Sequence, residues 1–284
     1  AMTRYSALAV STKYWKPNDN YLEKVTLALT GKVNNGDFVV ISEKAIATAT
    51  GCIIDEKAIV PNRNANFIAG FWMRIIWGYF LGLLCRFGQR LLNRLRNYPL
   101  ASGSRHKHVV LIHAGLLQAL MFGSEGGIDG SNLPYSYVSL PLLNTDYFAQ
   151  KIQSYIFKKL GKNVCVIISD TDKTYRFYNF YFTPRPKPLR GIHSFGGVFV
   201  YVIGKMLGLR RSSTPLAVAG CSLSVRDALK ITNIADRARG PGSGDTVWDM
   251  ASRFKVGVTD VSWSMLDSIT HKPIVIVRKL KTKD

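Results

Sequence analysis

The chain has 284 residues with 38 Lys or Arg and 18 Asp or Glu, so its formal net charge is +20. This length can bury a sizeable core and suffices for one large domain or two of ordinary size. The four cysteines are widely separated and lack Cys-x-x-Cys or Cys/His spacing, which argues against a zinc site and a disulfide framework. We therefore expect reduced thiols and, without a recognisable export signal, a cytoplasmic protein.

The positive charge is concentrated in two long spans that contain no acidic residue. These spans are residues 57–124 and residues 173–226. Such fields attract polyanions, whether nucleotides, phosphorylated cofactors or RNA. The alternative is that the excess charge serves only solubility.

The N-terminal part has the pattern of an α/β unit. Residues 21–29 have the apolar spacing of a short amphipathic helix, and residues 34–37 (Asn-Asn-Gly-Asp) predict a turn. The apolar run 38–41 that follows is typical of a buried strand. Lys44 comes just after this strand, where a lysine can meet a phosphate, although most such lysines are simply solvated.

Residues 65–98 form a long helical segment that is first apolar and then basic. The stretch 65–87 is long enough to cross a bilayer, but Arg74 and three glycines interrupt it. Downstream, Arg86, Arg90 and Arg94 recur every four residues beside an apolar stripe. We expect a buried or subunit-interface helix and no stable membrane span. A peripheral membrane helix is the intermediate alternative.

A strand is predicted for residues 105–112, opened by Arg105, His106, Lys107 and His108. Two histidines two residues apart on a strand share a face, which suits a metal. The interleaved bases instead favour contact with an anion or a plain surface. Further along, residues 138–142 are predicted as a strand and residues 146–160 as a helix that ends at Gly161.

Two short acidic loops stand out because acids are scarce in this chain. Gly126–Asn132 contains Asp129, and residues 168–172 (Ile-Ser-Asp-Thr-Asp) follow a buried apolar run and contain Asp170. Aspartates beside Gly, Ser, Thr and Asn suggest oxygen ligands for a hard cation. The alternative is that each aspartate is an ordinary turn or helix cap.

The order of these motifs closely resembles the coenzyme F-420-0:L-glutamate ligase family, also called the F-420 gamma-glutamyl ligases. The matching strings are Gly-Ile-Asp-Gly-Ser-Asn at 127–132, Leu-Gly-Lys-Asn-Val at 160–164 and Val-Ile-Ile-Ser-Asp-Thr at 166–171. The resemblance is strongest over residues 127–177 and weaker over residues 16–55. It implies a GTP-dependent ligase that adds an amino acid such as L-glutamate to a phosphorylated deazaflavin through an acyl phosphate.

By position, the resemblance also implies the roles of individual residues. Two magnesium or manganese ions would sit at the nucleotide, with Asp129, Asp170, Thr171 and Asp236 as metal-binding residues. Asp129 and Asp170 would serve catalysis together with Arg176, which would neutralise phosphate. The residues that would hold GTP are Ser11, Thr12, Lys13, Tyr14, Glu43, Lys44 and Asn132. The pattern of the glycine loop itself, and not the resemblance, adds that this loop closes over the nucleotide with Gly242, Ser243, Gly244, Asp245 and Thr246.

Two positions depart from the family pattern. Residues 47–51 read Ala-Thr-Ala-Thr-Gly where the family has Ser-Lys-Ala-Glu-Gly, so a nucleotide-facing lysine is missing unless Lys44 replaces it. Arg237 stands where a carboxylate near the second metal is expected. The alternative function is therefore a divergent paralogue that binds nucleotide or RNA without ligation.

A basic, proline-rich segment at residues 183–190 and the glycine loop at 240–246 complete the pattern. The glycine loop could cradle phosphate, but it lacks the P-loop lysine, and a linker with Asp245 or Thr246 as helix cap is its ordinary interpretation. We expect an α+β fold of mixed or antiparallel sheets with packed helices, similar to the glutamate ligases. The chain would form one ligase-like unit, or alternatively two subdomains at about residues 1–125 and 126–284. Two chains would form an intertwined homodimer.

Overall fold

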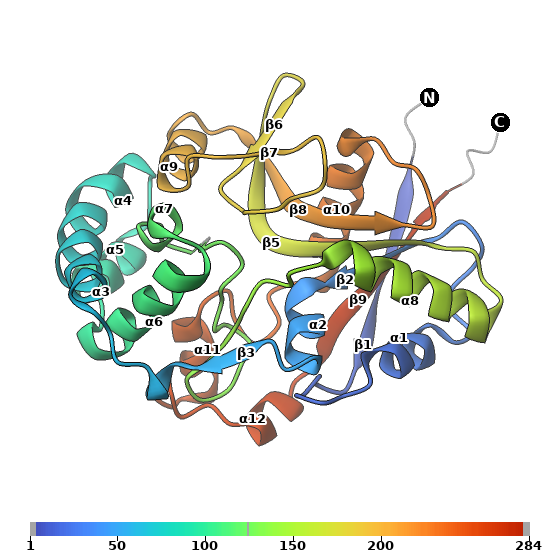
Figure 1. Ribbon diagram of the computed structural model, residues 1–284, viewed down its shortest axis with the longest axis horizontal. Coiled ribbons are helices and arrows are strands. Elements are labelled where there is room, and N and C mark those ends of the chain that lie inside the picture. Colours follow the sequence, from blue (N-terminus) through green and yellow to red (C-terminus); the bar gives the residue numbers. More distant parts are fainter. Residues whose placement is uncertain (1–3, 124, 281–284) are drawn as a thin grey trace.

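A seven-stranded mixed sheet with helices on both faces forms one side of the molecule, and a lobe of helices forms the other (Figure 1). The computed structural model describes residues 4–123 and 125–280. The expected α+β class is confirmed. The strands are β1 (Tyr5–Thr12), β2 (Phe38–Ser42), β3 (Ile53–Asp55), β4 (Tyr137–Ser139), β5 (Cys165–Phe177), β6 (Phe180–Thr183), β7 (His193–Ser194), β8 (Arg210–Ala219) and β9 (His271–Lys279).

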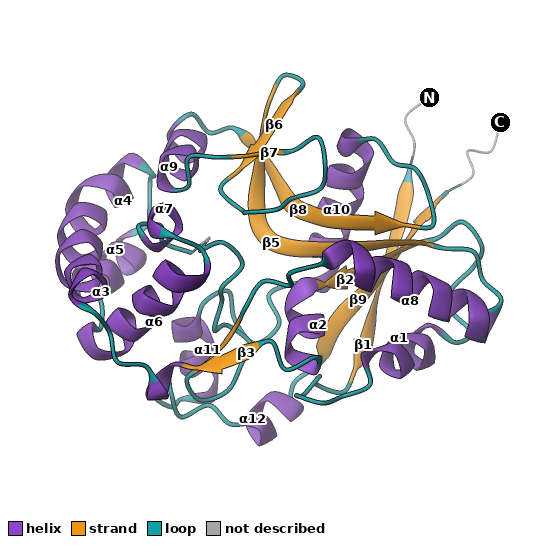
Figure 2. Cartoon of the chain, in the orientation of Figure 1, coloured by secondary structure: helices purple, strands orange, loops and turns teal. Residues whose placement is uncertain are grey.

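The order in the large sheet is β1-β9-β2-β5-β6-β7, with β8 paired to β5. β2 and β5 run parallel, whereas β9 runs antiparallel to both β1 and β2. Strands from both ends of the chain, β1 and β9, therefore lie side by side, with β1 at the edge of the sheet (Figure 2). β3 and β4 form a separate two-stranded ribbon.

The sheet is covered on both faces because its central strands are apolar at successive positions. Val39 and Ile41 of β2 face α1, α2 and α8, whereas Val40 faces α10. α8 begins at its cap Asn144, which accepts from the Tyr147 amide, and ends at the left-handed Gly161, as predicted. These helices are α1 (Tyr21–Leu29), α2 (Glu43–Ala49), α8 (Thr145–Leu160) and α10 (Val225–Arg239).

The helical lobe surrounds a second core that contains Met73, Trp77, Leu95 and Met121. The expected long helix over residues 65–98 is interrupted by a turn at residues 85–88, so the apolar and the basic parts are separate helices. The lobe consists of η1 (Glu56–Ala58), α3 (Arg63–Phe67), the π-helical η2 (Ile68–Leu81), α4 (Gly82–Leu84), α5 (Gln89–Arg96), α6 (Leu100–His113), α7 (Leu116–Ala119) and α9 (Val198–Met206), with α11 (Val247–Phe254) and α12 (Trp263–Asp267) beneath it.

Three expectations from the sequence are wrong in this region or nearby. Residues 105–112 lie in helix α6 and not in a strand, because His106 and Lys107 turn inward onto buried carboxylates. The second acidic stretch, 168–172, is not a loop but lies inside β5. Cys165 and Cys221 form a disulfide, so the expected four reduced thiols are wrong for this pair, and Cys52 and Cys85 are the free cysteines of the described chain.

Candidate active site

Asp170 is positioned by an irregularity in β5. The pairing of β5 with β8 shifts register between Ile168 and Ser169, and again between Asp170 and Lys173. A bulge of this kind re-aims side chains and is common beside active sites. Asp170 and Thr171 consequently face a cavity at this point, whereas Asp172 is buried and accepts a hydrogen bond from the Gly127 amide at 3.1 Å.

Asp129 is held by its own loop and by a lysine from α2. The Ser131 amide donates to Asp129 Oδ1 at 2.7 Å, and the Ser131 hydroxyl donates to Oδ2 at 2.7 Å. Lys44 Nζ forms an ion pair with Asp129 and donates to the Ser131 carbonyl at 2.9 Å. The first acidic loop is therefore fixed to the first turn of α2, directly after β2.

Arg185 joins this loop, β5 and α2 through one buried guanidinium. Its Nε donates to Asp170 at 2.7 Å, and its Nη2 lies 2.8 Å from both carboxylate oxygens of Glu43. Gly127 has φ of +89°, and a Cβ there would lie 2.7–2.8 Å from the Arg185 guanidinium. Glycine is required at this position both for the left-handed backbone and for the space that Arg185 occupies.

The carboxylates around Arg185 outnumber the cations that neutralise them. Burial would lower the pKa of Arg185, but the charges of Glu43, Asp170 and Asp172 outweigh it and raise that pKa. Burial and the neighbouring charge of Asp170 raise the pKa of Asp172 well above its ordinary value. The buried surroundings thus favour the protonated form of Asp172, while Asp170 forms an ion pair with Arg185.

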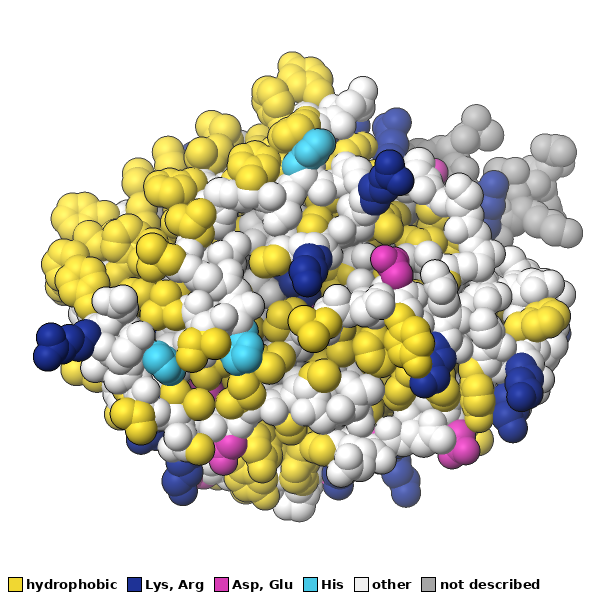
Figure 3. Space-filling view, in the orientation of Figure 1, with side chains coloured by type: hydrophobic (Ala, Val, Ile, Leu, Met, Phe, Trp, Pro, Cys, Tyr) yellow, Lys and Arg dark blue, Asp and Glu magenta, His cyan; other side chains and the backbone are white. Residues whose placement is uncertain are grey.

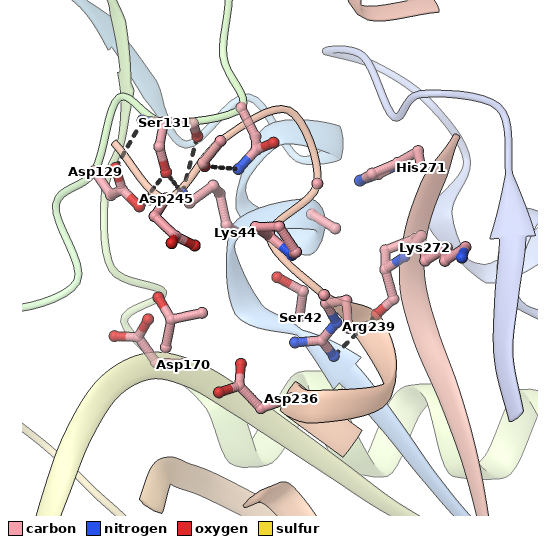
Figure 4. Close-up of a pocket in the computed structure, with 18 of the residues that line it drawn as sticks. Ser42, Lys44, Asp129, Ser131, Asp170, Asp236, Arg239, Asp245, His271 and Lys272 are labelled. Atoms are coloured by element: carbon pink, nitrogen blue, oxygen red, sulfur yellow. Dashed lines mark hydrogen bonds and ion pairs between the residues drawn. The ribbon is translucent and has the colours of Figure 1, made fainter. Parts of the chain in front are cut away.

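The first cavity, of about 410 Å³, has an acidic side and a basic side (Figure 4). Asp129, Asp170, Asp236 and Asp245 form the acidic side. Lys272 and Arg239 lie across from them, on β9 and at the end of α10. Such a division suits a ligand with a polyanionic tail that shares its charge with cations.

Arg239, which lines this cavity, has an unused hydrogen-bond donor. Its Nη2 makes a long contact of 3.4 Å with the Pro273 carbonyl, and its Nε is buried without a hydrogen-bond partner among the described residues. Burial lowers the pKa of Arg239, and Asp236 opposes that shift. A buried guanidinium with a free donor is a site where an anionic oxygen would gain a charge-assisted hydrogen bond.

A second cavity of about 650 Å³ adjoins the first and is richer in apolar side chains. Tyr98, Phe122, Tyr137 and Trp248 contribute to its wall. The residues that line both cavities are Gly123, Asp129, Asp170, Thr171 and Asp245. The three aspartates therefore stand at the boundary between a charged cavity and an aromatic one.

The glycine loop is tied to the first acidic loop through Asn132. Asn132 Oδ1 accepts from the Ser243 amide at 2.7 Å and from its hydroxyl at 2.5 Å. Gly242, Gly244 and Asp245 line the first cavity, whereas Thr246 lines the second and caps α11 by accepting from the Asp249 amide. Of the two caps that the sequence allows, Asp245 and Thr246, the helix uses Thr246, and Asn132 holds this loop beside the cavity.

Tyr14 and His271 close the far end of the first cavity as a stacked pair, with ring centroids 4.2 Å apart. Burial lowers the pKa of His271 to about 4, although the Lys13 carbonyl that faces it acts in the opposite direction. His271 is therefore a neutral aromatic ring at physiological pH. A planar pair of this kind is a surface against which a heterocycle can pack.

The structure does not bring every expected residue to this site. Glu43 is 3% exposed and is engaged by Arg185 and the Leu142 amide, so it does not face a ligand in the first cavity. Arg176 lies on the β5–β6 hairpin and donates to the Tyr178 carbonyl at 2.6 Å, away from both cavities. Ser11, Thr12 and Lys13 belong to or follow β1 and, unlike Tyr14, do not line the cavity.

The residues present fit divalent ions in part. The side-chain donors on the acidic side are oxygens, which magnesium and manganese prefer. Within residues 4–123 and 125–280, however, no group of three or more His, Cys, Asp or Glu is arranged to hold a metal. Magnesium is commonly held by one or two carboxylates together with substrate phosphates, so Asp129 and Asp170 fit a nucleotide-bound ion. Asp236 is paired with Lys173 at 2.9 Å.

A buried charged cluster forms part of the wall of the second cavity. His106 Nδ1 lies 2.6 Å from Glu56, its Nε2 pairs with Glu125, and Lys107 donates to Glu125 at 2.6 Å. Burial would lower the pKa of His106, but the charges of Glu56 and Glu125 raise it to about 10. Because Glu125 immediately precedes the first acidic loop, this cluster anchors the start of that loop.

Arg185, Arg239 and Lys272 are among the basic residues of the site that were missed from sequence alone. Arg185 lies in the proline-rich segment, for which the sequence predicts no site role, and its burial depends on partners far away in the chain. An arginine between two prolines is the only local signal. Arg239 follows the predicted family helix motif by two residues, and nothing in its neighbours indicates an unpaired donor.

The fold and the site together define an α+β protein with two adjoining cavities, and comparison with known proteins gives the family. The F420-0:gamma-glutamyl ligase family model matches residues 9–220, so the chain belongs to this family. The chain is also 32% identical over 284 residues to an uncharacterized protein of Methanocaldococcus jannaschii, with 96% of each chain covered. The matched family region ends before Asp236, Arg239 and the glycine loop, which complete the first cavity.

Proposed function

We propose that this protein is a GTP-dependent ligase that joins an amino acid such as L-glutamate to a phosphorylated deazaflavin-like acceptor, coenzyme F-420-0. Membership of the F420-0:gamma-glutamyl ligase family supports a ligase of F-420 biosynthesis. The observation that carries the finer proposal is the placement of Asp129 and Asp170 in the wall shared by two cavities. The carboxylate that is to be activated and the phosphate donor must meet at one point.

The charged cavity would hold the nucleotide. Arg239 and Lys272 would contact its phosphates, and the Tyr14–His271 pair would pack against its base. Lys44, in the first turn of α2, would take the place of the lysine that is missing from residues 47–51. Asp129 and Asp170 would hold magnesium or manganese at the phosphates, with Thr171 and Asp236 beside a second ion, and a bound ion supplies charge neutralisation at the transferred phosphate.

The larger, aromatic cavity would hold the acceptor. Its rings Tyr98, Tyr137 and Trp248 offer area for a planar heterocycle, and the acceptor carboxylate would point to the shared wall. Attack of that carboxylate on the γ-phosphate would form an acyl phosphate and release GDP. The amine of the amino acid would then displace inorganic phosphate and form the amide.

The test is phosphate release from GTP with magnesium, L-glutamate and F-420-0, followed by mass analysis of the product. Asp170→Asn and Asp129→Asn should each lower kcat/KM by about a hundredfold or more, as loss of metal-site residues does. Asp146→Asn, an exposed acid in the first turn of α8, is the matched control and should retain activity. Absence of glutamate-dependent turnover in the unmodified protein would contradict the proposal.

The runner-up function is a paralogue that binds nucleotide or RNA without ligation. The two acid-free spans favour it, although Arg237, the base at an expected acidic position, is exposed and does not line either cavity. Tight tRNA binding with a steep dependence on salt, combined with no turnover, would support this alternative. The homodimer remains a prediction, which sedimentation equilibrium would check.

A further inference from the structure

One face of the helical lobe exposes large apolar side chains that no part of the described chain covers. We call it the apolar face and define it by Phe71, Phe80 and Leu83 of η2 and α4, and Phe199, Ile203 and Leu207 of α9. These side chains are between 45% and 64% exposed. α4 contacts α9, and Figure 3 shows the yellow side chains gathered along the left and upper edge of the molecule. Contiguous apolar surfaces of this kind mark interaction sites.

The helix that supplies half of this face cannot be surrounded by lipid. Residues 63–84 are apolar and long enough to span a bilayer by length and composition, and 33% of the most apolar window is buried in the protein. Trp72 and Trp77 both donate to the Leu120 carbonyl, at 2.8 and 2.7 Å, and Arg74 donates to the Tyr98 carbonyl. One side of the helix is thus fixed to the lobe, and only the other side is available to a partner.

The charge around the apolar face is of one sign. Every residue that defines the face lies in one of the two spans without Asp or Glu, 57–124 and 173–226. Arg86 follows the end of α4 and is exposed, as are Arg210 and Arg211 after α9. Lys205, in the last turn of α9, lies 5.8 Å from the centre of the Phe87 ring. The face is therefore apolar at its centre and basic at its border.

We infer that the apolar face docks this protein on the surface of a membrane that contains anionic lipids. Apolar side chains that enter the boundary between headgroups and acyl chains, with basic side chains at the headgroups, are what such a surface binds. A second copy fits less well, because a symmetric contact would bring two basic borders together without any carboxylate to pair with them. This inference is independent of the ligase reaction.

The experiment is flotation of the full chain with vesicles of phosphatidylcholine alone and of phosphatidylcholine mixed with phosphatidylglycerol. We expect binding to the mixed vesicles and little to phosphatidylcholine. The pair Arg86→Gln and Arg210→Gln should weaken partitioning by about fivefold for each residue, as expected for a base at an anionic surface. The pair Phe80→Ser and Phe199→Ser should weaken it by about tenfold or more for each.

Matched controls lie on α8, on the sheet side of the molecule. Phe157→Ser removes an apolar side chain that is 52% exposed, and Lys158→Gln removes an exposed base. Both should bind as the unmodified chain does, and circular dichroism verifies that all variants are folded. Equal binding by the face variants and the controls would overturn the inference. Vesicle binding that resists extraction by alkaline carbonate would indicate a membrane span and would also overturn the inference. A dimer that dissociates in the face variants while their vesicle binding stays the same would overturn it as well. Competition by tRNA through the same side chains, without vesicle binding, would also overturn it.

Discussion

Arg185 donates from Nε to the carboxylate of Asp170 across 2.7 Å, and the same guanidinium binds Glu43. The side chain is 3% exposed, so this pairing takes place out of water. Arg185 therefore orients Asp170 from the buried side of that residue. Asp170 also borders both cavities. Positioning by a buried partner of this kind fixes the geometry of a functional carboxylate.

Arg185→Met should destabilise the protein by about 3–5 kcal/mol, because it leaves buried carboxylates without their cation. Urea denaturation followed by circular dichroism measures this change. Arg190→Met, which replaces an exposed arginine in the same segment, should change the free energy of unfolding by less than about 0.5 kcal/mol. Equal stability of the two variants would show that Glu43 and Asp170 do not depend on Arg185.

Arg239→Gln should weaken GTP binding by about tenfold or more, since a hydrogen bond to a charged group contributes about 1.5–3 kcal/mol. The reason is that the buried Nε has no hydrogen-bond partner among the described residues and that Arg239 lines the charged cavity. Isothermal titration with GTP and magnesium gives the dissociation constant. Arg237→Gln, an exposed base on the same helix, is the control and should bind as before. A loss of affinity in both variants would indicate long-range electrostatics and not a specific contact.

Stability should fall on the alkaline side because of His106. Its pKa is about 10 in the folded protein against an ordinary value of 6.5, so the folded state binds this proton more tightly. The stabilisation is complete below about pH 6.5 and is lost as the pH rises through about 10. The free energy of unfolding should be measured from about pH 6 to about pH 10 at steps of about one pH unit. It should decline with rising pH in the unmodified chain and decline less in His106→Gln.

The control for this pH dependence is His113→Gln, an exposed histidine at the end of the same helix. It should keep the alkaline decline of the unmodified chain. An identical slope in His106→Gln would mean that the imidazolium does not hold Glu56 and Glu125 as described.

The disulfide between Cys165 and Cys221 closes a loop with a sequence separation of 56. Cys221→Ser should lower the free energy of unfolding by up to about 4 kcal/mol, the loop-closure value for that separation. Cys52→Ser, at a free cysteine, is the control. Thiol titration in denaturant checks the premise, because two reactive thiols are expected and four would contradict it.

The local sequence pattern correctly predicted those elements whose formation depends only on residues nearby in the chain. The strand at Phe38, the helix ended by Gly161 and the cap at Thr246 each depend on neighbours within a few residues. The family was also recognisable from the strings around Asp129 and Asp170, and the structure brings both residues to the wall of the same cavity.

The features that the sequence did not predict depend on contacts between distant parts of the chain. The run around His106 is consistent with a strand by local pattern, but two carboxylates at positions 56 and 125 draw it into a buried helix. Glu43 follows a strand end like a ligand-binding acid, yet Arg185, 142 positions later, engages it. Such pairings are set by the tertiary fold, so periodicity and spacing contain no signal for them.

The wall of aspartates between the two cavities allows the residues of each cavity to evolve separately. Substitutions among the rings around Trp248 reshape one chamber and leave Arg239 and Lys272 in the other untouched. If the charged cavity holds the nucleotide and the aromatic one the acceptor, as proposed, a lineage can change its acceptor while it keeps the same nucleotide. Divergence within such a family should accumulate on the aromatic side of the partition and spare the partition itself.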